Sequence, residues 1–211
     1  MSSIALATSL GGFFQDAVDA ALQARHLEAT RGAASYLAAL LSELAHPDPA
    51  MEHALDCPLA FLLDEAVQSA ESERLQRFKT LGDAVLYLAG FFGDHIEHRG
   101  VDKAYVASVG ATAYLCAAAT ARRRRAWHKA QRARQAQGQD EDSVFGELSA
   151  KFDGFVEVLT TVADTALARQ ARGQWGILKL YERWLRSGSP ALAAELGTHG
   201  LLPVRGPGGV H

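Results

Sequence analysis

The sequence predicts an all-α protein, an irregular bundle of about seven or eight helices around a buried central helix. Alanine is abundant and isoleucine is scarce, which favours helices over strands. No segment shows the alternation of apolar and polar residues that marks a half-buried strand. The segment between Thr80 and Gly93 is apolar or small at every position except Asp83. A helix with apolar side chains on nearly all faces must be surrounded by protein, so this segment is expected at the centre.

Apolar residues at helical spacing predict three helices in the N-terminal third of the chain. The first covers about residues 13–26. The second follows Thr30, which can cap it, and ends at residues 46–49, where two prolines disfavour a helical backbone in the residues before them. A loop is expected from there to Asp56, and Pro58 then suits the first turn of the third helix. The polar run at residues 69–74 either ends this helix or joins it to the next.

The middle of the chain predicts three further helices. The central helix presents one apolar stripe, formed by Phe78, Leu81, Val85, Leu88 and Phe92. Gly100 can end this helix, and Asp102 can cap the next one, which runs into a basic segment. A polar stretch at residues 135–143 is typical of an exposed linker, and a long apolar stripe then predicts a helix up to about residue 166.

Two shorter helices complete the expected fold. One covers about residues 174–188, and Ser189 with Pro190 forms a cap and first turn for the last helix, which ends near Leu196. The predicted domains are a helical core at residues 1–172 with a basic insertion at about 122–139, a helical appendage at 173–202 and a disordered tail at 203–211.

Composition and charge indicate a cytoplasmic protein. The net charge of −3 argues against polyanion binding by the molecule as a whole. Cys57 and Cys116 lie far apart and form no disulfide framework. The N-terminus lacks a basic segment followed by a long apolar core, so no signal peptide is expected. Residues 104–121 carry no charge, but they are mostly Ala, Gly, Ser and Thr, so we expect a buried helix there and no membrane span.

A basic segment at residues 122–134 stands out against this acidic background. It holds seven of the 21 Lys and Arg residues and no acid. The candidate residues for binding nucleic acid or another polyanion are Arg122, Arg123, Arg124, Arg125, Lys129, Arg132 and Arg134, and Trp127 adds a surface for stacking. The alternative is a solvated extension of a helix, neutralised by the acids at residues 140–142.

A polar stripe on the central helix is a second candidate site. Asp83 and Asp94 are about three helical turns apart, so both point the same way, with Tyr87 between them and His98 beyond. One interpretation is a polar groove in which His98 serves as an acid or base. The other is that these groups make structural hydrogen bonds with neighbouring helices.

A metal centre has weaker support. Glu43 and His46 have the spacing that places a carboxylate and an imidazole on one helical face, and Asp94 and His98 could add ligands from another helix. Di-iron bundles, however, carry two such motifs with two further glutamates, and no second motif is present. We therefore expect no metal and no other cofactor.

Three aromatic residues near the C-terminus suggest an interface. Trp175 and Trp184 point to opposite sides of their predicted helix, so one can pack on the body while the other, with Tyr181, lines a contact. The sequence has no phosphate-binding loop, no dinucleotide-binding motif and no nucleophile elbow, so no catalytic residue is assigned.

The strings LGDAVLYLAGFF, VDKAYVASVGATAYLCAA and ILKLYERWLRSGSPALAAELGTHGLLP resemble a group of uncharacterised all-helical proteins from proteobacteria. The resemblance covers most of the chain outside the basic insertion. It implies a bacterial, cytosolic, all-α protein and carries over no activity and no functional residue.

These observations favour a non-catalytic interaction protein that forms a homodimer and binds a protein partner. Polyanion or nucleic-acid binding through residues 122–134 is the first alternative. A metal-dependent enzyme built on a helical bundle is the second, and a small-molecule pocket in the bundle stays open.

Overall fold

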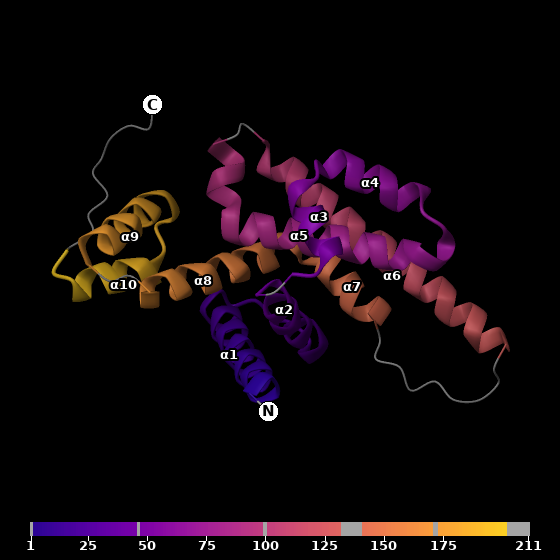
Figure 1. Cartoon of the computed structure of the whole chain (residues 1–211), viewed down its shortest axis with the longest axis horizontal. Helices are drawn as coiled ribbons and strands as arrows, with labels where there is room; N and C mark the ends of the chain where they lie inside the picture. Colours follow the sequence, from indigo (N-terminus) through magenta and orange to yellow (C-terminus); the bar gives the residue numbers. More distant parts are fainter. Residues whose placement is uncertain (1, 46, 99–100, 132–140, 171–172, 202–211) are drawn as a thin grey trace. The chain divides into compact units, whose positions relative to one another are not determined.

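The computed structural model describes residues 2–45, 47–98, 101–131, 141–170 and 173–201. It contains helices and no strand within these ranges, which confirms the predicted all-α class (Figure 1). The helices are α1 (Ser2–Ala24), α2 (Arg31–Leu44), α3 (Pro49–Asp56), α4 (Leu59–Gln68), α5 (Glu71–His98), α6 (Lys103–Gln131), α7 (Glu141–Ala150), α8 (Phe152–Gln170), α9 (Gly173–Ser187) and α10 (Pro190–Thr198).

The described part of the chain forms ten helices, two more than the highest expected number. The first additional helix is α3, where a loop was expected. Asp48 accepts a hydrogen bond from the backbone N–H of Met51 at 2.7 Å, and Pro49 occupies the first turn, where its missing N–H costs nothing. Met51 and Ala54 are buried, so this short helix also contributes to the core.

The second additional helix arises at Lys151, where one expected helix is divided into α7 and α8. The backbone N–H of Lys151 still closes the last turn of α7 on the carbonyl of Glu147 at 2.9 Å. The Lys151 ammonium donates to the carbonyl of Glu28 at 2.8 Å, which fixes this junction against the loop that leads to α2. The polar run at residues 69–74 ends α4 and begins α5, because Ser69 and Ala70 separate the two helices.

The chain divides into two compact units, residues 1–159 and 160–211. In the first unit, α5 and α6 make the most extensive contact between helices. Gly110 of α6 allows part of this packing, because a Cβ there would lie 2.9 Å from Cγ1 of Val85 in α5. Residues 81–86 of α5 are buried, whereas Phe92, at a kink with φ −123° and ψ 21°, is 47% exposed. Burial of the central segment is therefore complete only in its first half.

The second unit has its own apolar core. Its members are Ala168, Leu180, Trp184, Leu192 and Leu196. Gly188 joins α9 to α10 with a φ of 64°, a left-handed conformation that glycine adopts at little cost. Buried Asp164 forms an ion pair with Arg183 beside this core.

One described segment, Lys103–Trp127 of α6, has the length and apolar composition of a membrane span. Half of its most apolar stretch is buried in this structure, and the helix packs against α5 and α7. The core helix of a folded protein can have the same length and composition. The expectation of a buried helix and no membrane span at residues 104–121 therefore stays a prediction.

Candidate functional site

Asp83 is the buried centre of a polar cluster in the first unit. Its Oδ1 accepts hydrogen bonds from the hydroxyls of Tyr36 at 2.6 Å and Tyr114 at 2.7 Å. Its Oδ2 forms an ion pair with Nζ of Lys79 at 2.9 Å. These four residues, which we name the Asp83 centre, come from α2, α5 and α6. The carboxylate is 0% exposed, yet each of its oxygens has a donor, as a buried charge requires.

Local sequence explains how the cluster is assembled. Lys79 and Asp83 are four residues apart, so they lie on one face of α5 and can pair. Gly82 lets the ring of Tyr114 lie directly against α5, because a Cβ at Gly82 would be 2.8 Å from Cε1 of that ring. Tyr36 and Tyr114 pack edge to face with their centroids 6.4 Å apart, which orients the hydroxyls toward the same carboxylate.

Burial and charge fix the protonation of this cluster. Burial, and secondarily the Asp83 carboxylate, raises the pKa of both Tyr36 and Tyr114 well above its ordinary value. Both hydroxyls therefore stay protonated and donate. Burial disfavours the charge on Lys79, but Asp83 outweighs it and raises the pKa of the ammonium. Lys79 is consequently a cation at neutral pH.

A groove of about 810 Å³ lies between α2, α5 and α7 and reaches this cluster. Tyr36 and Lys79 belong to both the Asp83 centre and the groove wall, and the ammonium of Lys79 lies 5.5 Å from the centroid of the Tyr36 ring. The groove is lined by Thr30, Arg31, Gly32, Ser35, Tyr36, Ala39, Leu75, Gln76, Lys79, Ser143, Val144 and Phe145.

The lining combines positive charge with apolar surface. Arg31 and Lys79 are its charged members, and none of these twelve described residues is an acid. Leu75, Val144 and Phe145 provide apolar contacts. The arrangement suits a molecule with an acidic group at one end and an apolar body, because ligand sites are mostly apolar with a few placed polar groups.

A polar contact joins α2 and α7 at the rim of the groove. The Thr30 hydroxyl caps α2 by accepting from the N–H of Ala33 at 3.2 Å and donates to the Glu147 carboxylate. Lys151 pairs with Glu147 at 2.9 Å. Although burial alone would raise the pKa of Glu147, the Thr30 and Lys151 contacts prevail and lower it. Glu147 thus holds the two helices together as a carboxylate.

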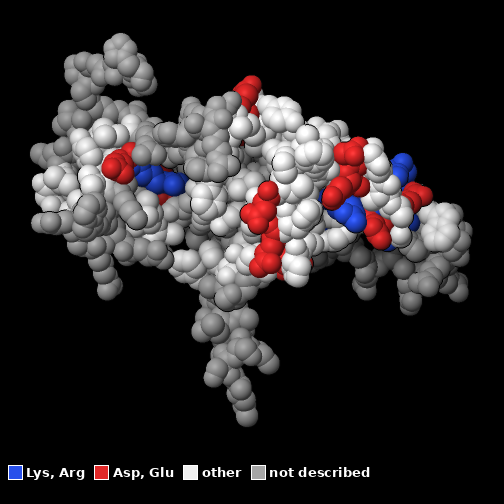
Figure 2. Space-filling model, turned by 45° about the horizontal axis from the view of Figure 1, so that its top comes forward, with Lys and Arg blue, Asp and Glu red and all other residues white. Residues whose placement is uncertain are grey.

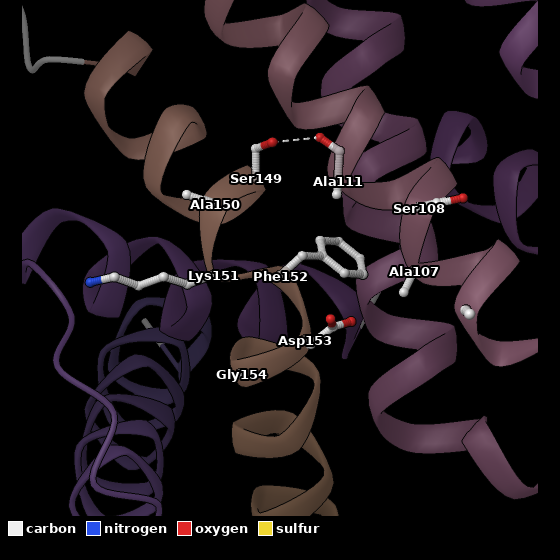
Figure 3. Close-up of a pocket in the computed structure, with 10 residues that line it drawn as sticks. Ala107, Ser108, Ala111, Ser149, Ala150, Lys151, Phe152, Asp153 and Gly154 are labelled. Carbon is white, nitrogen blue, oxygen red and sulfur yellow. Dashed lines mark hydrogen bonds between the residues drawn. The ribbon is translucent and has the colours of Figure 1, made fainter.

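A second hollow of about 360 Å³ lies where α6 meets the α7–α8 junction (Figure 3). Alanines and serines dominate its lining, and the Ser149 hydroxyl donates to the carbonyl of Ala111 at 2.8 Å. Figure 3 shows Asp153 at this hollow, whereas the side chain of Lys151 extends away from it. The smaller volume and the lack of an inward cation make this hollow a weaker site than the groove.

Asp83 and Tyr87, two residues of the predicted polar stripe, have different neighbours in the structure. Asp83 contacts Lys79 and the two tyrosines, but the ring of Tyr87 packs against Phe91 and Phe92 with centroids 4.9 and 5.6 Å away. Burial raises the pKa of Tyr87. The side chains of Asp94 and His98 lie outside the described part of the molecule, so the predicted acid–base role of His98 stays a prediction.

The predicted metal ligands are not brought together within the described residues. Glu43 is exposed on α2, while His46 and the side chains of Asp94 and His98 lie outside those residues. Among the described side chains, no group of three or more His, Cys, Asp and Glu could hold a metal ion.

The basic segment lies at the end of α6. Arg122, Arg123 and Arg124 are exposed and Arg125 is half-buried. Trp127 is 60% exposed. The side chain of Lys129 and the whole of Arg132 and Arg134 lie outside the described residues, so only part of the predicted polyanion surface is seen.

The predicted aromatic interface is seen only in part. Trp184 is 6% exposed and belongs to the core of the second unit, and Tyr181 is half-buried beside it with centroids 5.8 Å apart. In this unit Trp184 is therefore a packing residue, so it gives no support to the predicted interface. The side chain of Trp175 lies outside the described region, and self-association stays a prediction.

No family model, no curated protein and no solved structure matches this chain. The resemblance to proteobacterial helical proteins, and the cytoplasmic location that it implies, remain predictions.

Proposed function

We propose that the first unit binds a small amphipathic molecule with an acidic group, in the groove between α2, α5 and α7. The observation that carries the proposal is the lining of this groove, which has two cations, no acid and an apolar wall within about 810 Å³. That volume lies in the range of roughly 300–1,000 Å³ that is typical of small-molecule sites. The proposal specifies a location and a ligand class for the small-molecule pocket that the sequence left open.

The chemistry of the lining sets the expected pose. The acidic group would lie near Lys79 and Arg31, because an anion gains most from positioned cations. The apolar body would lie against Leu75, Val144 and Phe145. Asp83 would hold Lys79 in place from behind, since their pair at 2.9 Å fixes the ammonium at the groove wall.

Binding fits this site better than catalysis. The hydroxyls of Tyr36 and Tyr114 both donate to Asp83, and their raised pKa values make them poor proton sources at neutral pH. A general acid or base works best with a pKa near the operating pH. The tyrosines therefore support the architecture of the groove.

A fluorescent anionic probe, anilinonaphthalene sulfonate, tests the proposal on the full chain. We expect saturable binding of one probe per chain, competed by decanoate. Ala39→Trp places an indole in the groove from an exposed position and should weaken binding about ten-fold, because it fills the volume that the probe needs. Arg31→Gln should weaken it roughly two- to five-fold, the usual value of an exposed ion pair.

The matched control is Ala60→Trp, which adds the same indole at an exposed alanine of α4 outside the groove. It should leave probe binding unchanged. Circular dichroism and urea unfolding of each variant would exclude probe binding to a loosened core. Equal effects of Ala39→Trp and Ala60→Trp, or unsaturable binding, would reject the groove as the site.

A further inference from the structure

Four consecutive arginines lie in the C-terminal part of α6. Successive residues of an α-helix point about 100° apart, so Arg122 to Arg125 project in four directions around the axis. Arg122, Arg123 and Arg124 are exposed, and no acid occurs from Lys103 to Gln131. Figure 1 places this end of α6 at the margin of the first unit. The helix thus presents positive charge in the directions of Arg122, Arg123 and Arg124.

Within the described residues, this charge has no acidic partner at Arg122, Arg123 or Arg124. Arg123 makes only a 3.5 Å contact to the hydroxyl of Thr120. Other arginines of the chain differ, because Arg25 pairs with Glu157 and Arg77 pairs with Glu65 and Glu73. On the face shown in Figure 2, basic side chains likewise lie next to acidic ones.

The helix dipole does not account for these arginines. Cations are stabilised at the C-terminus of a helix only within about the last turn. The structure continues α6 to Gln131, so Arg122 to Arg125 precede that turn. The neighbouring like charges of Arg122, Arg123 and Arg124 repel one another, and an external anion would relieve that repulsion.

We propose that this end of α6 binds single-stranded nucleic acid. Arg122, Arg123 and Arg124 would contact phosphates, and the 60% exposed Trp127 would stack on a base. Proteins that bind single strands combine these two elements, a positive surface that follows the backbone and an aromatic ring for the bases. The surface is separate from the proposed ligand groove, because none of its residues lines that groove.

The same geometry argues against an anionic membrane as the partner. A helix that lies on a bilayer needs an apolar face opposite its charged face. Arg122, Arg123 and Arg124 are exposed in different directions, and Trp127 is the single large apolar side chain from Arg122 to Gln131, so this stretch has no apolar stripe. Charge without a segregated apolar stripe favours a nucleic acid.

Fluorescence anisotropy with a labelled thymidine 20-mer tests the proposal on the full chain. Three phosphate contacts to a single strand predict an affinity that falls about twenty-fold between 50 and 200 mM salt. Removing two of these three arginines, as in Arg122→Gln with Arg124→Gln, should reduce the slope of log affinity against log salt to about one third of its value. Trp127→Ala should weaken binding about ten-fold, while Trp127→Phe should retain most of it.

A charge-matched control removes two arginines elsewhere, Arg25→Gln with Arg77→Gln, and should change the salt slope little. Salt-independent binding, or equal losses in this control, would overturn the proposal. Equal affinity for a 20-base-pair duplex would overturn the assignment to single strands. Binding to phosphatidylserine vesicles without binding to the oligonucleotide would overturn the nucleic acid as partner. Unchanged circular dichroism is required of every variant.

Discussion

Lys79 and Asp83 lie one helical turn apart on α5, with Nζ and Oδ2 separated by 2.9 Å and the carboxylate fully buried. This pair links the buried core of the first unit to the wall of the groove. Its acid joins α5 to α2 and α6 through the hydroxyls of Tyr36 and Tyr114, and its base forms part of the groove wall. The same residues therefore determine both the stability of the core and the charge of the candidate site.

Replacing Asp83 with alanine should cost about 3–5 kcal/mol of the free energy of unfolding, because two tyrosine hydroxyls and the partly exposed Lys79 ammonium lose their common acceptor. Asp83→Asn should cost less, since its amide oxygen still accepts from the tyrosines. Urea unfolding followed by circular dichroism measures both values. A loss below about 1 kcal/mol for Asp83→Ala would contradict the buried pair.

Tyr114→Phe and Tyr36→Phe each remove one hydroxyl that donates to the carboxylate. Each should cost about 1.5–3 kcal/mol, the usual contribution of a hydrogen bond to a charged group. The double variant should differ from the sum of the two, because both hydroxyls bond the same oxygen of Asp83. A double-mutant cycle measured by urea unfolding checks this, and strict additivity would show that the two bonds are independent.

Gly110→Ala should destabilise the protein by about 1–3 kcal/mol through overpacking. The added Cβ would lie 2.2 Å from Cζ of Phe152 and 2.9 Å from Cγ1 of Val85. The matched control is Gly146→Ala on α7, where a Cβ meets nothing within 4 Å. It should be neutral or stabilising by up to about 1 kcal/mol, because alanine favours a helix over glycine. Thermal and urea unfolding measure the stability changes of Gly110→Ala and Gly146→Ala. Equal changes in the two variants would argue against close packing at Gly110.

Most of the fold follows from local sequence, but the two additional helices show where local reasoning fails. The prolines at residues 47 and 49 indicate a loop by local rules, but Asp48 and Pro49 form the cap and first turn of α3. The break at Lys151 has no glycine or proline to mark it. At this break Lys151 donates to the carbonyl of Glu28, which is 123 residues away in the chain and which no local pattern indicates.

The candidate site was predictable only in part for the same reason. Asp83 is the single polar exception in the central apolar segment, and Lys79 has the spacing of a helical ion pair, so both could be selected from sequence. Tyr36 and Tyr114 are 47 and 31 residues away from Asp83. No periodicity relates them, and only the packing of α2 and α6 on α5 brings them to one carboxylate.

The contact between Glu147 and Thr30 should make stability depend on acid pH. The pKa of Glu147 is below its ordinary value of 4.5, so the unfolded chain binds more protons than the folded one in the interval between the two pKa values. The contribution of Glu147 is present above pH 4.5 and is lost as the pH falls through the folded pKa. Urea unfolding from pH 6 to pH 3 should therefore show a smaller loss of stability for Glu147→Gln than for the wild type. Glu52→Gln, at an exposed glutamate of α3, is the control; a wild-type profile in Glu147→Gln would show that Glu147 does not fasten α7 to α2.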